Sequence, residues 1–178
     1  FTYCGNEEFD YILDTIKKMT KDLKARPKRK ARKNTIKPLI GQKINIDFDR
    51  EQTHIFIGRP AYSVNNSNDL YLKMITTYLS GQSSELFVEV RDRQGLCYAV
   101  QPLHHTALEA GYWGIYIGAG KDKVDSAISA IMDILNRLQK DGLSKKEFER
   151  IKVMLDGQNQ LNIQTNDDYA NFYSIPVL

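Results

Sequence analysis

The hydrophobic positions change their period several times along the chain, and each change marks a predicted helix or strand. Apolar residues at helical spacing predict helices at 9–23, 70–79, 86–93, 124–138 and 148–155. Alternating or continuous apolar runs predict strands at 44–48, 53–58, 96–103 and 112–118, and a strand tail at 1–5. The first two full strands are close enough in sequence to form a hairpin. We therefore expect an α+β fold, a two-layer sandwich of a mainly antiparallel sheet covered by helices.

Capping and turn residues support these boundaries. Asn6 is expected to cap the first helix, and Ser83 or Ser84 the helix at 86–93. Gly95 suits the left-handed position that follows a helix end. The sequence Ser-Lys-Lys-Glu at 144–147 is a capping box, in which the serine and glutamate side chains each accept a hydrogen bond from a free backbone N–H.

Composition adds the expectation of one globular domain. The chain has 178 residues, of which 42% are hydrophobic and 26% charged, as in ordinary soluble proteins. It begins inside a predicted strand and ends soon after a further helix start at Asp167, so we expect a single domain, residues 1–178, truncated at both ends. No apolar run approaches the roughly 18 residues that span a membrane, so we expect a soluble protein without a membrane partner and assign no compartment.

The net charge of +3 comes from one basic run. Residues 24–33 hold seven Lys or Arg and no acid, within a predicted basic loop at 24–43. Such a run could bind nucleic acid or an anionic membrane. No aromatic residue interleaves with it, however, which favours a solvated loop and no nucleic-acid partner.

The residue types that ligate metals lack the spacing of a metal site. Cys4 and Cys97 form no CxxC pair, so buried thiols are favoured and one disulfide stays an alternative. His54, His104 and His105 form neither HxxEH nor HExxH. Because consecutive strand residues point to opposite faces, we expect one of the two adjacent histidines to be packed and the other solvated. No metal site is expected in this chain.

Residues 79–98 are the most informative segment. Here a capped helix, a glycine turn and a strand follow one another, with Arg91 near the helix end and Tyr98 just inside the strand. Both side chains could converge beside the turn, where a guanidinium and a phenol suit a peptide carbonyl or an oxyanion. Alternatively, the arginine stabilises the helix dipole and the tyrosine packs in the strand. Spacing alone favours this structural alternative.

The same segment resembles a signature of the pitrilysin/insulysin zinc metallopeptidases, which include the mitochondrial processing peptidases. Their inactive repeat carries a pattern close to LGGxxSSRLFxE[VI]RExxGLxY. The matching residues are Leu79, Gly81, Ser83, Ser84, Leu86, Phe87, Glu89, Val90, Arg91, Gly95, Leu96 and Tyr98. The departures are Ser80, Glu85 and Asp92, at surface or turn positions. The stretches 3–6, 53–60, 114–118 and 142–147 resemble further parts of the family's fold.

The resemblance implies a role for the chain within a larger peptidase. In that family two homologous halves close around a peptide, and one half supplies zinc through HxxEH and a distant glutamate. This chain resembles the other, non-catalytic half, with a processing-peptidase-like fold, a peptide substrate and no zinc of its own. By resemblance, Arg91 would grip a substrate carbonyl and Tyr98 would donate to the oxyanion formed when zinc-bound water attacks. The HxxEH-bearing partner half could be fused or a separate subunit. The alternative is a catalytically dead member with a structural or assembly role.

Overall fold

The computed structural model describes residues 1–24 and 41–174. The predicted basic loop at 24–43 therefore lies outside the described residues except at its two ends. The chain divides into two compact units, one of Phe1–Arg32 with Asp156–Leu178 and one of Lys33–Leu155. Each unit is described by itself below.

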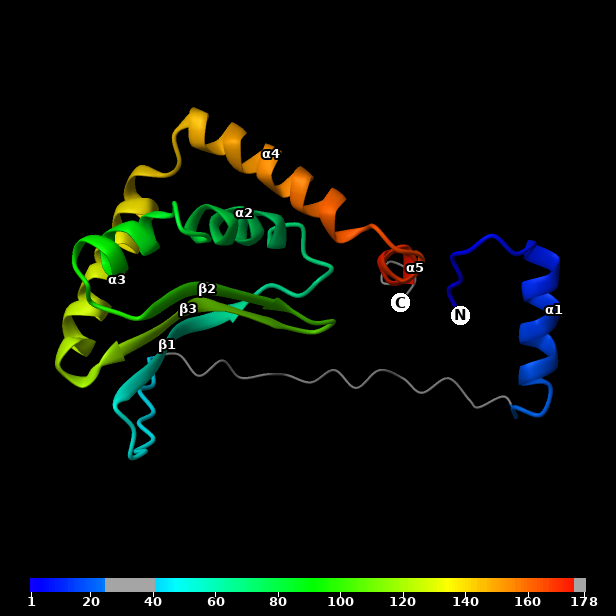
Figure 1. Ribbon diagram of the computed structural model, residues 1–178, viewed down its shortest axis with the longest axis horizontal. Helices are drawn as coiled ribbons and strands as arrows, with labels where there is room; N and C mark the ends of the chain where they lie inside the picture. Colours follow the sequence, from blue (N-terminus) through cyan, green and yellow to red (C-terminus); the bar gives the residue numbers. More distant parts are fainter. Residues whose placement is uncertain (25–40, 175–178) are drawn as a thin grey trace. The chain divides into compact units, whose positions relative to one another are not determined.

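The larger unit is built on a three-stranded sheet (Figure 1). Its strands are β1 (Gln52–Ala61), β2 (Ala99–Thr106) and β3 (Gly111–Gly120), in the order β1-β3-β2. Both pairings are antiparallel, and β2 and β3 form a hairpin. The strands are rich in β-branched and aromatic residues, which favour extended backbone.

Helices cover one face of this sheet. They are α2 (Asp69–Leu79), the π-helix η1 (Leu86–Arg93), the short 3-10 turn η2 (Lys121–Lys123), α3 (Val124–Asp141) and the first turns of α4 (Lys145–Asn162). In Figure 1, α2 and α3 lie on the same side of the sheet. Fully buried side chains from the strands and helices meet in between: Leu79, Leu86, Val90, Ile115, Ile117, Ile131 and Ile151. Burying each of these contributes about 1.5–3 kcal/mol. The structure thus confirms the α+β sandwich.

The opposite face of the sheet carries aromatic and histidine side chains. Phe56 and Tyr112 are 48% and 45% exposed and pack edge to face, with ring centroids 5.8 Å apart. Next to them His105 stacks on Tyr112, and His54 forms a 2.7 Å hydrogen bond with the Tyr116 hydroxyl. This face therefore differs from the aliphatic face beneath the helices.

The smaller unit contains α1 (Phe9–Thr20) and α5 (Asn166–Ser174) together with the last part of α4. At the start of α5, the Thr165 hydroxyl accepts a hydrogen bond from the Asp168 N–H at 3.2 Å, and the Asp168 carboxylate accepts the Thr165 N–H at 2.9 Å. This is a reciprocal cap of the kind predicted at 144–147, at a place where the sequence indicated only a helix start.

Several predicted strand features are wrong. Residues 1–5 and 44–48 form no strand, so the predicted hairpin of 44–48 with 53–58 is absent. Ile44, Ile46 and Phe48 are all at least 72% exposed, because no described segment pairs with this run and gives its apolar side a surface to pack on. The strand at 53–58 runs on through Pro60, which an edge strand tolerates because its outer side needs no N–H.

Most predicted caps and turns of the larger unit are confirmed. The Ser84 hydroxyl accepts the Phe87 N–H at 3.3 Å, and Gly95 has a φ of 58°. In the capping box, the Ser144 hydroxyl accepts the Glu147 N–H at 3.3 Å, and the Glu147 carboxylate accepts the Ser144 N–H at 3.0 Å. The Asn6 cap is wrong, since α1 begins after Glu8 without a side-chain cap.

Candidate functional site

The two predicted site residues flank the connection between η1 and β2. A π-helix has a wider turn than an α-helix and occurs frequently at functional sites. Here the Gln94 N–H donates to the Glu89 carbonyl at 3.3 Å, the five-residue step of that helix. Gly95 then takes the left-handed conformation that lets the chain reverse toward β2.

Backbone hydrogen bonds hold this connection at both ends. The Gly95 N–H donates to the Arg91 carbonyl at 3.1 Å, and the Leu96 N–H to the Val90 carbonyl at 2.9 Å. On the strand side, the Tyr98 N–H donates to the Gly118 carbonyl of β3 at 2.7 Å. The backbone that carries Arg91 and Tyr98 is therefore fixed to the helix on one side and to the sheet on the other.

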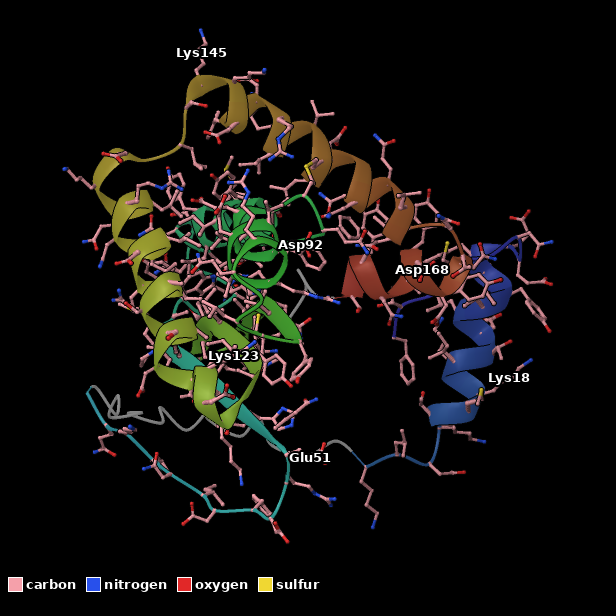
Figure 2. All side chains as sticks on the ribbon, turned by 60° about the vertical axis from the view of Figure 1, so that its left-hand side comes forward. Lys18, Glu51, Asp92, Lys123, Lys145 and Asp168 are labelled. Atoms are coloured by element: carbon pink, nitrogen blue, oxygen red, sulfur yellow. The ribbon has the colours of Figure 1, made fainter. Side chains whose placement is uncertain are left out.

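A lysine adds a third attachment. The Lys123 ammonium donates to the Gly95 carbonyl at 2.9 Å, so η2 also binds the turn. Figure 2 labels Lys123 and Asp92, the neighbour of Arg91 on η1. A cation at the carbonyl end of a helix is also favoured by the helix dipole.

Arg91 lies on the exposed side of η1. The buried side of the same helix is formed by Leu86 and Val90, both 0% exposed. The Arg91 guanidinium lies over the Phe87 ring, 4.7 Å from its centroid. Among the described residues it has no ion-pair partner, whereas its neighbour Arg93 binds Glu89 at 2.7 Å.

Tyr98 is 63% exposed and lies one residue before β2. The prediction that it lies just inside the strand is therefore wrong by a small shift. The regular strand starts at Ala99, although the Tyr98 N–H already donates to the Gly118 carbonyl of β3. Within the described part of the chain, no side-chain hydrogen bond involves the Tyr98 hydroxyl, so this hydroxyl is available to a ligand.

Arg91 and Tyr98 are thus two exposed donor side chains on one braced connection. A guanidinium and a phenol can both bind a carbonyl oxygen or an oxyanion. No hydrogen bond joins the two side chains to each other within the described ranges. Their catalytic and substrate-binding roles stay predictions at this point.

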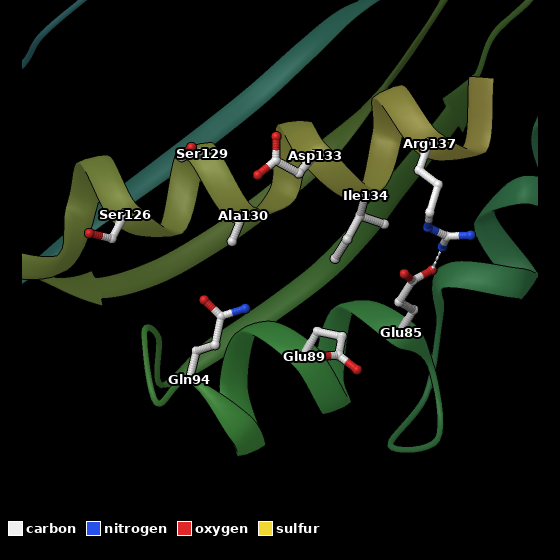
Figure 3. A pocket seen from close by; sticks show the side chains of 9 residues that line it. All are labelled: Glu85, Glu89, Gln94, Ser126, Ser129, Ala130, Asp133, Ile134 and Arg137. Atoms are coloured by element: carbon white, nitrogen blue, oxygen red, sulfur yellow. Dashed lines mark hydrogen bonds and ion pairs between the residues drawn. The ribbon is translucent and has the colours of Figure 1, made fainter. Parts of the chain in front are cut away.

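A polar cluster that the sequence analysis did not identify lies close to η1. A cavity of about 510 Å³ between η1 and α3 is lined in part by Glu85, Glu89, Asp133 and Arg137 (Figure 3). Arg137 forms an ion pair with Glu85. The hydroxyl of Tyr78, 9% exposed, also contacts Glu85, and burial raises the pKa of Tyr78. These residues join α2, η1 and α3. Arg137 lies 52 positions after Glu85, and no motif links these two parts of the sequence.

The adjacent histidines behave as predicted, one packed and one solvated. His104 has 8% of its side chain exposed and contacts the Asp69 carboxylate at 2.8 Å, while His105 is exposed. Across residues 1–24 and 41–174, no three His, Cys, Asp or Glu side chains are grouped to hold a metal ion. In the same ranges, no helix is long and apolar enough to cross a membrane.

Both cysteine thiols are free. Cys97 is buried, as predicted, and burial raises the pKa of its thiol although the Arg91 charge opposes this. The buried-thiol prediction is wrong for Cys4, which is half-buried because residues 1–5 do not enter a sheet.

Sequence comparison points to one protein family. A family model described as the peptidase M16 inactive domain matches residues 1–155. A Bacillus subtilis protein named as the uncharacterized zinc protease YmxG is 28% identical over 71% of this chain and 31% of its own length. A Streptomyces coelicolor protein, also named as an uncharacterized zinc protease, is 28% identical over 75% of this chain and 28% of its own length. The chain therefore spans about a third of these curated relatives.

Solved structures show the same fold. A protease from Helicobacter pylori aligns with a TM-score of 0.78 at 15% identity, over 98% of this chain and 44% of that one. A peptidase M16 inactive domain from Pseudomonas fluorescens aligns with a TM-score of 0.62 at 20% identity, over 70% of this chain and 29% of that one. A chain of complex III2 from Candida albicans gives 0.73 at 20% identity, over 95% of this chain and 42% of that one.

Proposed function

Because the chain belongs to the family of peptidase M16 inactive domains, we propose that it is the non-catalytic, substrate-binding half of a zinc-dependent peptidase. The observation that carries the proposal is the pair Arg91 and Tyr98, exposed on a connection that is bonded to both helix and sheet. The names of the curated relatives support the zinc-protease context.

In this proposal Arg91 binds the substrate backbone. Its guanidinium donates charge-assisted hydrogen bonds to a carbonyl oxygen of the peptide on either side of the scissile bond. Because the carbonyl is present before and during the reaction, this contact mainly holds the substrate in place. Because hydrogen bonds hold the backbone of this connection, the position of the Arg91 Cα relative to the sheet is fixed.

Tyr98 has a different role in the proposal. Its phenol donates to the oxygen of the scissile carbonyl as negative charge develops there. A donor that is neutral and already aimed at that position stabilises the transition state more than the bound substrate. Tyr98 is therefore expected to affect turnover more than substrate binding.

Zinc chemistry does not fit the histidines of this chain. His104 is bound to Asp69, and His54 is bound to Tyr116 on the other face of the sheet. We therefore assign zinc, the HxxEH ligands and the general base to a partner half, in the same polypeptide or in a separate subunit. The two halves would close around a peptide, and this chain alone would not hydrolyse it.

A structural or assembly role is the second candidate. The similar fold in complex III2 from Candida albicans favours it, since that chain belongs to a complex. In this case Arg91 and Tyr98 would serve packing and solubility only. The two candidates differ in one measurable property, which is peptide hydrolysis that depends on these two side chains.

The test is peptide hydrolysis by the intact protein that contains this chain, or by the reconstituted pair of halves. We expect Tyr98→Phe to lower kcat roughly a hundredfold or more, as for loss of one oxyanion donor. We expect Arg91→Ala to lower kcat/KM on the order of tenfold to a hundredfold, as for loss of a hydrogen bond from a charged group. Tyr116→Phe, on the sheet face, is the matched control and should leave kcat unchanged. Unchanged turnover in both site variants, or no hydrolysis by the wild type, would favour the assembly role.

A further inference from the structure

The aromatic ring beneath Arg91 is the starting point. Phe87 and Arg91 are four positions apart on η1, and the Arg91 guanidinium carbon lies 4.7 Å from the centre of the Phe87 ring. A cation within about 6 Å of an aromatic face is attracted by the negative potential of that face. We infer that Phe87 is a positioning residue, which holds the Arg91 guanidinium in place for a substrate carbonyl. This inference rests on the function proposed above.

The helix backbone at Phe87 is held in place. Its backbone N–H is bound by the hydroxyl of Ser84, which is 4% exposed. The residues around it in the helix, Leu86 and Val90, are fully buried in the core. The ring is only half-buried, so one part of it faces the exposed arginine. An aromatic ring carried by this ordered backbone limits the conformations of an arginine side chain that is otherwise long and flexible.

The kind of partner matters for what Arg91 can do. An aromatic face attracts the guanidinium without using its N–H donors, which lie in the guanidinium plane. A carboxylate partner would instead occupy those donors and offset the charge. Arg93 on the same helix shows this second case, because its guanidinium donates to Glu89 at 2.7 Å. Of the two arginines of η1, Arg91 is therefore the one that is oriented and still free to bind a carbonyl.

Steady-state kinetics of the intact protein, with its zinc-bearing half, test the inference through Phe87→Leu. This change removes the ring and keeps an apolar side chain. We expect kcat/KM to fall roughly two- to fivefold, mainly through KM, which corresponds to loss of an exposed cation–π contact. Phe87→Tyr keeps an aromatic face and should retain the wild-type KM. Phe148→Leu, which removes the ring beside Lys152 on α4, is the matched control and should not change KM.

A double-mutant cycle separates positioning from general packing. In the Arg91→Ala background, Phe87→Leu should have no further effect on kcat/KM, because the group that it positions is gone. An equal fall in both backgrounds would show that Phe87 acts by packing, and would overturn the inference. If Arg91→Ala lowers kcat/KM while Phe87→Leu does not, the inference fails and the proposed function stands. If Arg91→Ala itself has no effect, the proposed role of Arg91 fails and the inference fails with it.

Discussion

Arg137 of α3 and Glu85, which directly precedes η1, form an ion pair between positions 52 residues apart in sequence. Glu85 is one of the three positions at which the chain departs from the family signature, where arginine is usual. The glutamate at this position is matched elsewhere in the fold, because Arg137 of α3 supplies the opposite charge. The pair also contacts the Tyr78 hydroxyl of α2, so it connects three helices of the layer above the sheet.

Exchanging the two charges of this ion pair is expected to restore the stability that a single substitution removes. Glu85→Arg should lower the free energy of unfolding by about 1 kcal/mol, because it places two arginines together beside a buried tyrosine. The double variant Glu85→Arg with Arg137→Glu should recover most of that loss. Urea denaturation of the purified chain measures both values. Equal losses in the single and double variants would show that the ion pair contributes nothing measurable.

The adjacent histidines predict unequal effects on stability. His104→Ala leaves the Asp69 carboxylate, 3% exposed, without its 2.8 Å partner and should cost about 2 kcal/mol. His105→Ala removes an exposed ring from the other face and should change stability by less than about 0.5 kcal/mol. Thermal and urea denaturation of the two variants, measured side by side, provide the comparison. Similar losses would contradict a structural role for the His104–Asp69 contact.

The capping box predicts a pH-dependent contribution to stability. The Ser144 hydroxyl and N–H donate to the Glu147 carboxylate and hold its pKa below the ordinary value. The contribution is therefore fully present above the unfolded pKa, about 4.3. It is lost as the pH falls through the lower folded pKa. Ser144→Ala should cost about 1 kcal/mol at pH 7. The difference between wild type and Glu147→Gln should shrink between pH 7 and pH 3, and a constant difference would count against the assignment.

Replacing glycine with alanine is expected to have opposite effects on stability at two positions, Gly114 and Gly157. A Cβ at Gly114 in β3 would lie 2.6 Å from the Gly58 Cα and would also overlap the Ile57 carbonyl oxygen, both of which are backbone atoms. Gly114→Ala should therefore destabilise the sheet by several kcal/mol or prevent folding, as for severe overpacking. Gly157 in α4 has open space around it, and Gly157→Ala should stabilise the helix by about 0.5–1 kcal/mol. Comparison of melting temperatures tests the sign of each change.

The proposal that the partner half supplies zinc predicts that the isolated chain does not bind it tightly. After dialysis against zinc and removal of excess metal, the isolated chain should hold far less than one zinc per molecule by atomic absorption. Its histidines are bound to Asp69 and Tyr116 or lie singly on the surface. The intact protein with its HxxEH half is the control and should hold one zinc. Tight one-to-one zinc in the isolated chain would refute the proposal that the partner half supplies it.

Sequence patterns located the helices better than the strands, for a physical reason. A helix satisfies its own backbone, so the apolar spacing and glycine turn of 86–93 predict its bounds correctly. They do not predict its π-helical form. A strand, by contrast, makes its backbone hydrogen bonds only with an adjacent strand. The runs 44–48 and 53–58 look alike in sequence, but only the second finds one in β3.

The candidate site shows the same limit. The spacing of Arg91 and Tyr98 and the left-handed Gly95 were readable from the sequence. The Phe87 ring beneath Arg91 and the Lys123 bond to Gly95 were not, because they depend on side-chain geometry and on a segment 28 residues away.

The order of strands in the sheet also favours one order of assembly. β2 and β3 are joined by a short turn, so their hairpin closes a small loop and can form on the microsecond timescale. β1 pairs antiparallel with β3, and even the closest residues of this ladder, Ala61 and Gly111, lie far apart in sequence, so the pairing closes a much longer loop. On a ribosome β1 emerges first, yet it has no partner until β3 has been synthesised. During that interval its apolar row, including Ile55 and Ile57, is an unpaired edge that a chaperone or a second nascent chain could bind.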